Sequence, residues 1–151
     1  MCQPDWEQLM DPQKELPFRL DTWVDLAPFE RTLGMKIETA ENGEAVLAMP
    51  FTIKLAQGAG LLHGGALTAL ADTAAAMAIK TLLKEGTHFA TVSLEVDFLA
   101  PVREGEVKAI ARAEPSLDHE RVYVSSVDVI AEDGTVAATF ESIFKVALEQ
   151  A

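Results

Sequence analysis

The sequence has little cysteine and little positive charge, and both shortages limit what the protein can be. Cys2 is the one cysteine among 151 residues, so no disulfide can form within the chain, and we expect a reducing, cytoplasmic setting. Twelve Lys and Arg side chains stand against 24 Asp and Glu, which gives a formal net charge of −12. This excess of negative charge argues against nucleic acid or an anionic membrane surface as the main partner.

The chain also lacks the motifs of several export and enzyme classes. Its first residues show no basic segment followed by an apolar one, so we expect no secretory signal. His63, His88 and His119 have no metal-type spacing, and no Cys-x-x-Cys or His-Glu-x-x-His motif occurs, so we expect no metal site. No Gly-x-Ser-x-Gly elbow, P-loop or dinucleotide fingerprint is present, which argues against serine hydrolases and the common nucleotide cofactors.

The one long apolar run, residues 59–83, is poor in the side chains that membrane helices use. It is mostly alanine and contains His63, Asp72 and Lys80, so it is unsuited to span a bilayer. With 49% hydrophobic residues and no low-complexity tract, the chain has the length and composition of one folded domain with a buried core. We expect that domain over residues 28–151, with the Pro-punctuated residues 1–27 as an extension packing against it.

Turn residues and apolar spacing predict one short helix, one long helix and six strands. "LAPFERTLG" predicts the short helix, with Pro28 near its first turn and Gly34 just past its end. Asn42-Gly43 predicts a tight hairpin between the first two strands. The strands are expected at 35–40, 44–51, 91–99, 105–114, 121–131 and 135–146, and the long helix at 65–83.

Alternation along the later strands predicts which side chains face the core. In residues 91–98 polar and apolar side chains alternate, which predicts one buried face; the apolar set is Val92, Leu94, Val96 and Phe98. The alternation shifts near Ser125 and Ser126, which predicts a bulge or a strand covered on both sides. A long helix without a polar face must be covered, so we expect an α+β fold in which an antiparallel sheet curls around it.

Asp72 is the unusual residue of the long helix. An apolar stripe faces the expected sheet, and Asp72 points away from it; the stripe consists of Leu67, Leu70, Ala71, Ala74, Met77 and Ala78. The side chains one turn from Asp72 are small, so a ligand or a second chain could approach closely; they are Thr68, Ala69, Ala75 and Ala76. The alternative is an ordinary solvated helix acid.

The start of the same helix offers hydrogen-bond donors. The first amides of a helix lack internal partners and lie at the positive end of its dipole, and Gly64 and Gly65 leave these donors uncovered. Such a site stabilises an anion, including the oxyanion formed when a carbonyl is attacked; alternatively, the glycines only permit a tight turn. Asp72 lies roughly 11 to 13 Å along the axis. One chain therefore cannot bring both features to one carbonyl, but a symmetric dimer could.

The runs "GLLHGGALTALADTAAAMA" and "TVSLEVDFLAPVREGEV" resemble those of small hotdog-fold acyl-CoA thioesterases, in particular the PaaI-like type of phenylacetate degradation. The similarity covers residues from about 28 to 147 and includes the order of strands and helix. It implies a hotdog fold, with a sheet of about six antiparallel strands around one central helix. It also implies hydrolysis of aryl or short- to medium-chain acyl-CoA to free acid and CoA without a cofactor. The family builds each site across a homodimer interface, and its dimers usually pair into homotetramers.

The resemblance also implies a role for each matched residue. Asp72 corresponds to the nucleophile or general base, the amide of Gly64 to the oxyanion hole, and His63 to a residue that orients the site. Gln57 matches an Asn or Gln that positions the carbonyl or water. Thr91 matches a Ser or Thr that holds the water.

Further substrate contacts are expected at the helix start and from basic side chains. Gly65 adjoins the oxyanion position, and an acidic protein needs local cations for a phosphorylated ligand; the candidates are Arg103 and Lys108, with Arg112 and Lys84. Two alternatives to the thioesterase stay open. One is a non-catalytic acyl-CoA-binding module, which would not need Asp72, and the other is a hotdog dehydratase acting on a 3-hydroxyacyl thioester, which would rely on a His paired with an acid.

Overall fold

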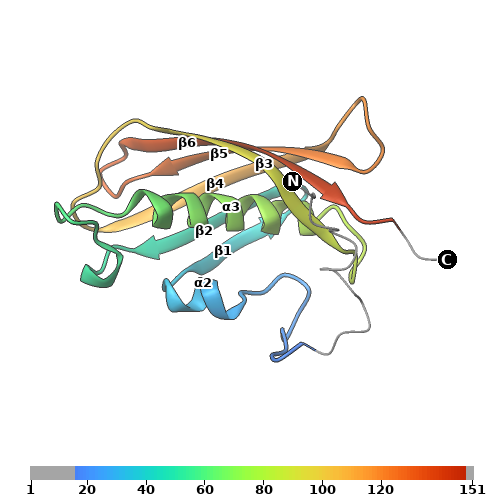
Figure 1. Cartoon of the computed structure of the whole chain (residues 1–151), viewed down its shortest axis with the longest axis horizontal. Coiled ribbons are helices and arrows are strands. Elements are labelled where there is room, and N and C mark those ends of the chain that lie inside the picture. Colours follow the sequence, from blue (N-terminus) through green and yellow to red (C-terminus); the bar gives the residue numbers. More distant parts are fainter. Residues whose placement is uncertain (1–15, 149–151) are drawn as a thin grey trace, which may run out of the picture.

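The computed structural model describes residues 16–148, in which an antiparallel sheet wraps around one long helix (Figure 1). In chain order the elements are α2 (Pro28–Thr32), β1 (Lys36–Glu41), β2 (Glu44–Pro50), the 3-10 turn η1 (Ile53–Leu55), α3 (Gly64–Lys80), β3 (Phe89–Phe98), β4 (Glu106–Pro115), β5 (Val122–Ile130) and β6 (Val136–Val146). The two predicted helices and six predicted strands are all present, although α3 ends at Lys80 rather than near residue 83. The α+β class and the hotdog arrangement are confirmed.

The strands follow the order β1-β2-β4-β5-β6-β3, and every neighbouring pair is antiparallel. β1 and β3 are therefore the two edges of the sheet. After β2 the chain runs through α3 to the far edge, forms β3 there, and returns to the middle as β4. This long connection lays α3 along one face of the sheet, where it packs mainly on β2, β4 and β5 (Figure 1).

α3 meets the sheet with small side chains. The predicted stripe is buried throughout: Leu67, Leu70, Ala71, Ala74, Met77 and Ala78. The sheet contributes larger residues, each at most 1% exposed: Leu47, Met49, Val107, Val127, Val129, Phe140 and Phe144. Each large apolar side chain buried in this way stabilises the fold by about 1.5 to 3 kcal/mol, and the alanines let the helix backbone approach the strands.

The predicted hairpin at Asn42-Gly43 is confirmed, and it also anchors the end of α3. Asn42 and Gly43 have φ values of 50° and 79°, as a two-residue turn between twisted strands requires. The Gly43 N–H donates to the Thr81 hydroxyl at 2.7 Å. The β1–β2 turn and the C-terminal end of α3 therefore hold each other in place.

The bulge predicted near Ser125 and Ser126 is wrong. β5 keeps an unbroken register with both neighbours across these residues. Ser125 is buried and lies directly opposite the buried Ser142, whereas Ser126 is exposed. β5 therefore alternates normally. Ser125 occupies a core-facing position where an apolar residue is usual, and Ser142 does the same in β6.

A bulge lies instead in β3, where the register with β6 shifts between Thr91 and Ser93. The inserted residue, Val92, reverses the alternation, so Thr91 shares a face with Leu94 and Phe98. Within one chain this face is not fully buried, because Leu94 is 44% and Phe98 57% exposed. The prediction of one buried face for residues 91–98 is therefore wrong at Thr91, which was expected on the opposite face. It is also incomplete, because Leu94 and Phe98 on this face remain exposed.

The described part of the N-terminal extension packs against the end of α3. The Trp23 indole N–H donates to the Lys80 carbonyl, and the Lys80 ammonium donates to the Trp23 carbonyl, both at 2.9 Å. The Trp23 ring meets Phe89 edge-on, with ring centroids 6.5 Å apart. The division of the chain at residue 27 stays a prediction, and Cys2 lies outside the described residues.

Two glycines with left-handed backbones allow a matched test of the β1–β2 turn. A Cβ on Gly43 would lie 2.8 Å from the Ala113 carbonyl oxygen, whereas a Cβ on Gly134, at φ +88°, would meet nothing within 4 Å. We expect Gly134→Ala to lower the free energy of unfolding by about 1 to 2 kcal/mol, the cost of a left-handed non-glycine residue. Gly43→Ala should cost clearly more, measured by urea unfolding at one fixed protein concentration. Equal losses would show that the contact with Ala113 does not constrain the turn.

Candidate active site

Asp72 lies half-buried on α3, on the side turned away from the sheet stripe. Its carboxylate Oδ1 accepts a hydrogen bond of 2.8 Å from the Thr91 hydroxyl. The bulge at Val92 makes this bond possible, because regular alternation would turn Thr91 to the other face of the sheet. The helix and the edge strand β3 are thus joined through Asp72 and Thr91.

Opposing effects set the charge state of Asp72. Burial raises the pKa of its carboxyl group above the ordinary value of 3.8. The Thr91 hydroxyl lowers this pKa by bonding the ionised form, and the negative charge of Glu30 raises it. The net result is a raised pKa, which is typical of carboxylates that accept or transfer protons.

Glu30, on α2, is a charged neighbour that the sequence analysis missed. Its Oε2 is buried and has no hydrogen-bond partner among residues 16–148. Its charge acts to raise the pKa of both Asp72 and Lys80, so it lies within electrostatic reach of two positions on α3. Only the packing of α2 against α3 could reveal this, because no spacing rule connects the two helices.

The N-terminus of α3 is capped by His63, which leaves one glycine amide free. The His63 Nδ1 accepts a hydrogen bond of 2.7 Å from the Gly65 N–H, so this nitrogen carries no proton. The His63 carbonyl accepts from the amides of Ala66 and Leu67 at 2.9 and 3.2 Å. The Gly64 N–H has no acceptor among the described residues. Of the two predicted glycine donors, Gly64 is available to a ligand and Gly65 is occupied.

An apolar pocket adjoins Gly64. It has a volume of about 330 Å³ and includes Gln57 beside the apolar residues Leu61, Leu67, Phe98, Leu99 and Val102. The Gln57 side-chain oxygen accepts from the Ala59 N–H of its own loop. Gln57 and Gly64 are therefore brought to one pocket, whereas Asp72 of the same chain is not among its lining residues.

The two predicted basic ligands lie in different places. Lys108 is on the face of the sheet opposite α3, where its ammonium pairs with Glu38 at 3.0 Å, and this hydrogen-bonded pairing raises the pKa of Lys108. Arg103 is exposed on the β3–β4 connection, next to Val102 of the apolar pocket. Arg103 itself lines a separate hollow together with Glu104, Glu132 and Asp133, so neither cation lines the pocket at Gly64.

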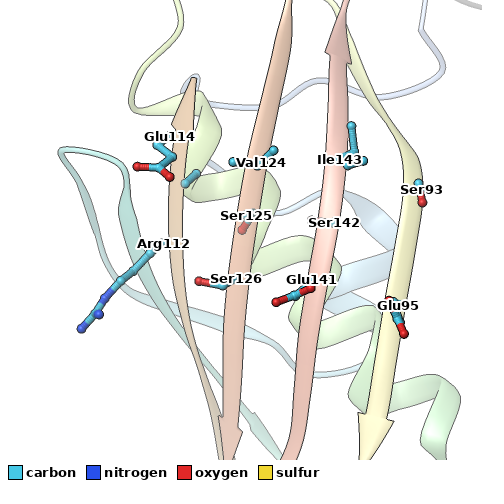
Figure 2. A pocket seen from close by; sticks show the side chains of 11 residues that line it. Ser93, Glu95, Arg112, Glu114, Val124, Ser125, Ser126, Glu141, Ser142 and Ile143 are labelled. Atoms are coloured by element: carbon cyan, nitrogen blue, oxygen red, sulfur yellow. The ribbon is translucent and has the colours of Figure 1, made fainter. Parts of the chain in front are cut away.

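A groove on the outer face of the sheet lies away from α3 and its pocket. It has a volume of about 530 Å³ and crosses β3 to β6 on the face opposite α3 (Figure 2). Glu95 and Glu141, which line it, are direct neighbours across β3 and β6. Of the predicted site residues only the basic candidate Arg112 lines it, and Arg112 lies 3.5 Å from Glu44, so we place the site at α3. Within residues 16–148, no cluster of three or more His, Cys, Asp or Glu is placed to hold a metal, and no described helix is long and apolar enough to cross a membrane.

Comparison with known proteins gives consistent matches. The family described as "Thioesterase superfamily" matches residues 59–138. ComA2 of Bacillus subtilis, described as a candidate esterase, is 42% identical over 81 residues, which are 52% of this chain and 64% of ComA2. The 1,4-dihydroxy-2-naphthoyl-CoA hydrolase of Listeria monocytogenes is 31% identical over 84 residues, 56% of this chain and 68% of the relative.

A solved structure covers more of the fold. A single-residue mutant of the phenylacetic acid degradation protein PaaI from Thermus thermophilus is 32% identical, with a TM-score of 0.71, and the match covers 79% of this chain and 98% of that one. The chain spans only 64% of ComA2, and 59% of a further curated relative from Halobacterium salinarum.

The raised pKa of Asp72 predicts a pH-dependent stability difference. A group whose pKa is raised on folding favours the folded state most below its unfolded pKa of 3.8, and this contribution is lost as the pH rises through the folded pKa. Asp72→Asn should therefore gain stability relative to wild type as the pH rises through that range, then level off at neutral pH, as measured by urea unfolding at several pH values.

Asp133 supplies a control of opposite sign. Its pKa is lowered by the Thr135 backbone N–H, so Asp133 stabilises the fold above pH 3.8 and loses this contribution as the pH falls. Asp133→Asn should therefore lose stability relative to wild type over the rising pH range. If the two variants showed the same trend, the assignment of a raised pKa to Asp72 would be overturned.

Proposed function

The chain belongs to the thioesterase superfamily, and from that premise we propose that it hydrolyses acyl-CoA thioesters to the free acid and CoA. The observation that carries the proposal is the state of the Asp72 carboxylate. It is partly desolvated, it accepts a hydrogen bond from the Thr91 hydroxyl, and its neighbours on the helix have small side chains. The naphthoyl-CoA hydrolase and the PaaI relatives support CoA thioesters as the substrate class.

The reaction needs a base or nucleophile and a donor for the carbonyl oxygen. Ionised Asp72 either attacks the thioester carbon or removes a proton from the attacking water, and Thr91 orients the carboxylate through their hydrogen bond. The free Gly64 N–H, at the positive end of α3, stabilises the negative charge that develops on the carbonyl oxygen. The C–S bond then breaks and the CoA thiolate leaves. On the general-base route, the proton that Asp72 took from the water passes to the thiolate. On the nucleophilic route, water then hydrolyses the anhydride between the acyl group and Asp72, which releases the free acid, restores the carboxylate and supplies the proton for the thiolate.

His63 and Gln57 arrange the donor side of the site. The imidazole of His63 caps α3 and so fixes the direction of the Gly64 amide. Gln57 lines the same pocket, and in this proposal its side-chain NH₂ positions the carbonyl or water. His63 bonds a backbone amide rather than an acid, which favours a thioesterase over the dehydratase alternative.

One chain alone does not complete the site, because Gly64 and Asp72 lie about 12 Å apart along α3 at 1.5 Å per residue. We therefore propose a homodimer that combines Asp72 of one subunit with Gly64 of the other. The edge strand β3 exposes Val92 and Leu94 beside this region, at 49% and 44%, which suits a surface covered by a partner. Pairing of dimers into a tetramer, a cytoplasmic location and contact of Arg103 with the CoA phosphates remain parts of the proposal.

The first test is release of CoA from a panel of phenylacetyl-, hydroxybenzoyl-, short- and medium-chain acyl-CoA thioesters. We expect the wild type to hydrolyse at least one of them, and Asp72→Asn to lose about a hundredfold or more in kcat. Circular dichroism and thermal unfolding check that the variant folds. If both proteins bind acyl-CoA and neither releases CoA, the domain is a binding module.

A second test asks whether two chains share each site. Gly64→Pro removes the amide donor at the first helical position, where proline is favoured, and the preceding His63 has φ −62° and ψ 132°, which a following proline tolerates. Gly64→Ala keeps the donor and is the matched control. Gly64→Pro and Asp72→Asn should each be inactive as homodimers.

Heterodimers of these two variants, isolated with two different affinity tags, distinguish a site shared by two chains from a site within one chain. A shared site predicts that one of the two sites is intact, with about half of the wild-type activity. Heterodimers as inactive as either homodimer would place Asp72 and Gly64 of one chain in one site.

A further inference from the structure

The ring of Phe98 lies directly against Gly64. A Cβ added to Gly64 would lie 3.1 Å from Cζ and 3.2 Å from Cε1 of that ring, closer than ordinary van der Waals contact. Phe98 is the last residue of β3 and faces the same side of the sheet as Thr91, because both lie across from core-facing residues of β6. The free amide donor of α3 and the end of the edge strand are therefore in contact through this one aromatic side chain.

The other surface of Phe98 is open. Its side chain is 57% exposed and lines the pocket of about 330 Å³ together with Leu61, Leu67, Leu99 and Val102. No charged side chain from residues 16–148 lines this pocket, and Gln57 is the one described side chain there with polar atoms. The space next to the Gly64 amide is thus apolar, with Phe98 as one wall.

We propose that Phe98 is a specificity-determining residue whose ring limits the size of the acyl group accepted beside the Gly64 amide. This inference rests on the proposed thioester hydrolysis. A carbonyl oxygen bound at Gly64 places the carbon chain of the acyl group within reach of the Phe98 ring, so the volume of this side chain sets the room next to the reacting carbon.

The chemistry of the pocket favours the acyl group over the pantetheine arm of CoA. That arm carries two amide groups and a hydroxyl, and burying them without hydrogen-bond partners is costly. The side-chain oxygen of Gln57 already accepts the Ala59 N–H, which leaves its NH₂ group and one lone pair of that oxygen for a ligand. A hydrocarbon or aryl group needs no such partners and suits the leucine, valine and phenylalanine walls.

The test is a size series at residue 98, assayed on a ladder of straight-chain acyl-CoA thioesters from butanoyl to decanoyl. A methylene gained or lost in an apolar pocket changes selectivity by about tenfold or more. Phe98→Ala should therefore raise the ratio of kcat/KM for decanoyl-CoA over butanoyl-CoA by about tenfold or more. Phe98→Leu should fall between Ala and wild type, and Phe98→Trp should shift the ratio toward the shorter substrate.

Phe29→Ala is the matched control, because Phe29 is 61% exposed on α2 and is not among the lining residues of the pocket. It should leave the chain-length ratio unchanged. Light scattering on each variant checks that the oligomer persists; if Phe98→Ala dissociates, the Leu and Trp variants carry the test.

The outcomes separate this inference from the proposed function. Wild-type hydrolysis with an equal change on all chain lengths in the Phe98 variants would overturn the role of Phe98 and leave the thioesterase standing. If the wild type hydrolysed only the aryl thioesters of the first panel, the proposed function would stand, and if it hydrolysed neither set, the proposed function would fail. In both cases binding affinities for the ladder would be measured instead. A chain-length shift in Kd would then support the role of Phe98, and an unchanged profile would overturn it.

Discussion

Close packing of α3 against the sheet is the constraint on which the rest of the structure depends. The buried stripe of the helix is largely alanine, so its backbone lies near the strands, and Leu70 and Ile79 fill the deepest places. Interiors packed at this density transmit changes in side-chain volume. A larger residue at Ala71 or Ala74 would push the helix outward, and would separate Asp72 from Thr91 at one point and Gly64 from Phe98 at another.

The same helix presents two polar features that a single chain leaves incomplete. Asp72 is partly desolvated and has one hydrogen bond from Thr91, and the first amide of α3, at Gly64, has no acceptor within the described residues. Folding alone would favour a neutral residue at 72 and a capped amide at 64. Such departures from local stability are typical of places where a protein binds or reacts, and under the proposed function both features act on one carbonyl between two subunits.

Two cations of the outer sheet face are paired with acids, whereas the exposed Lys36 and Lys145 have no ion pair within the described residues. Lys108 contacts Glu38 at 3.0 Å and Arg112 lies 3.5 Å from Glu44, whereas Glu95 and Glu141 lie directly across from each other. Near the candidate site, positive potential comes from the α3 dipole, while Arg103 on the neighbouring connection lies among Glu104, Glu132 and Asp133.

The sequence by itself determined the elements and their order, and it singled out Asp72 as the acid of the proposed site. The turn residues Asn42-Gly43 and the apolar stripe of α3 depend on residues that are close in the sequence, so both can be recognised from the sequence alone. The resemblance carried by the His-Gly-Gly segment added Thr91 as a neighbour of Asp72, which strand alternation contradicted. Tertiary structure decided what depends on contacts between distant segments. The bulge at Val92 turns Thr91 toward Asp72, because an extra residue in one strand reverses every side chain on one side of it. Likewise, His63 bonds Gly65 and so leaves Gly64 as the free donor, Glu30 reaches the site from another helix, and Phe98 covers Gly64 from the end of β3. No spacing in the sequence encodes these contacts, since they arise only when the edge strand, α2 and the start of α3 pack around one another.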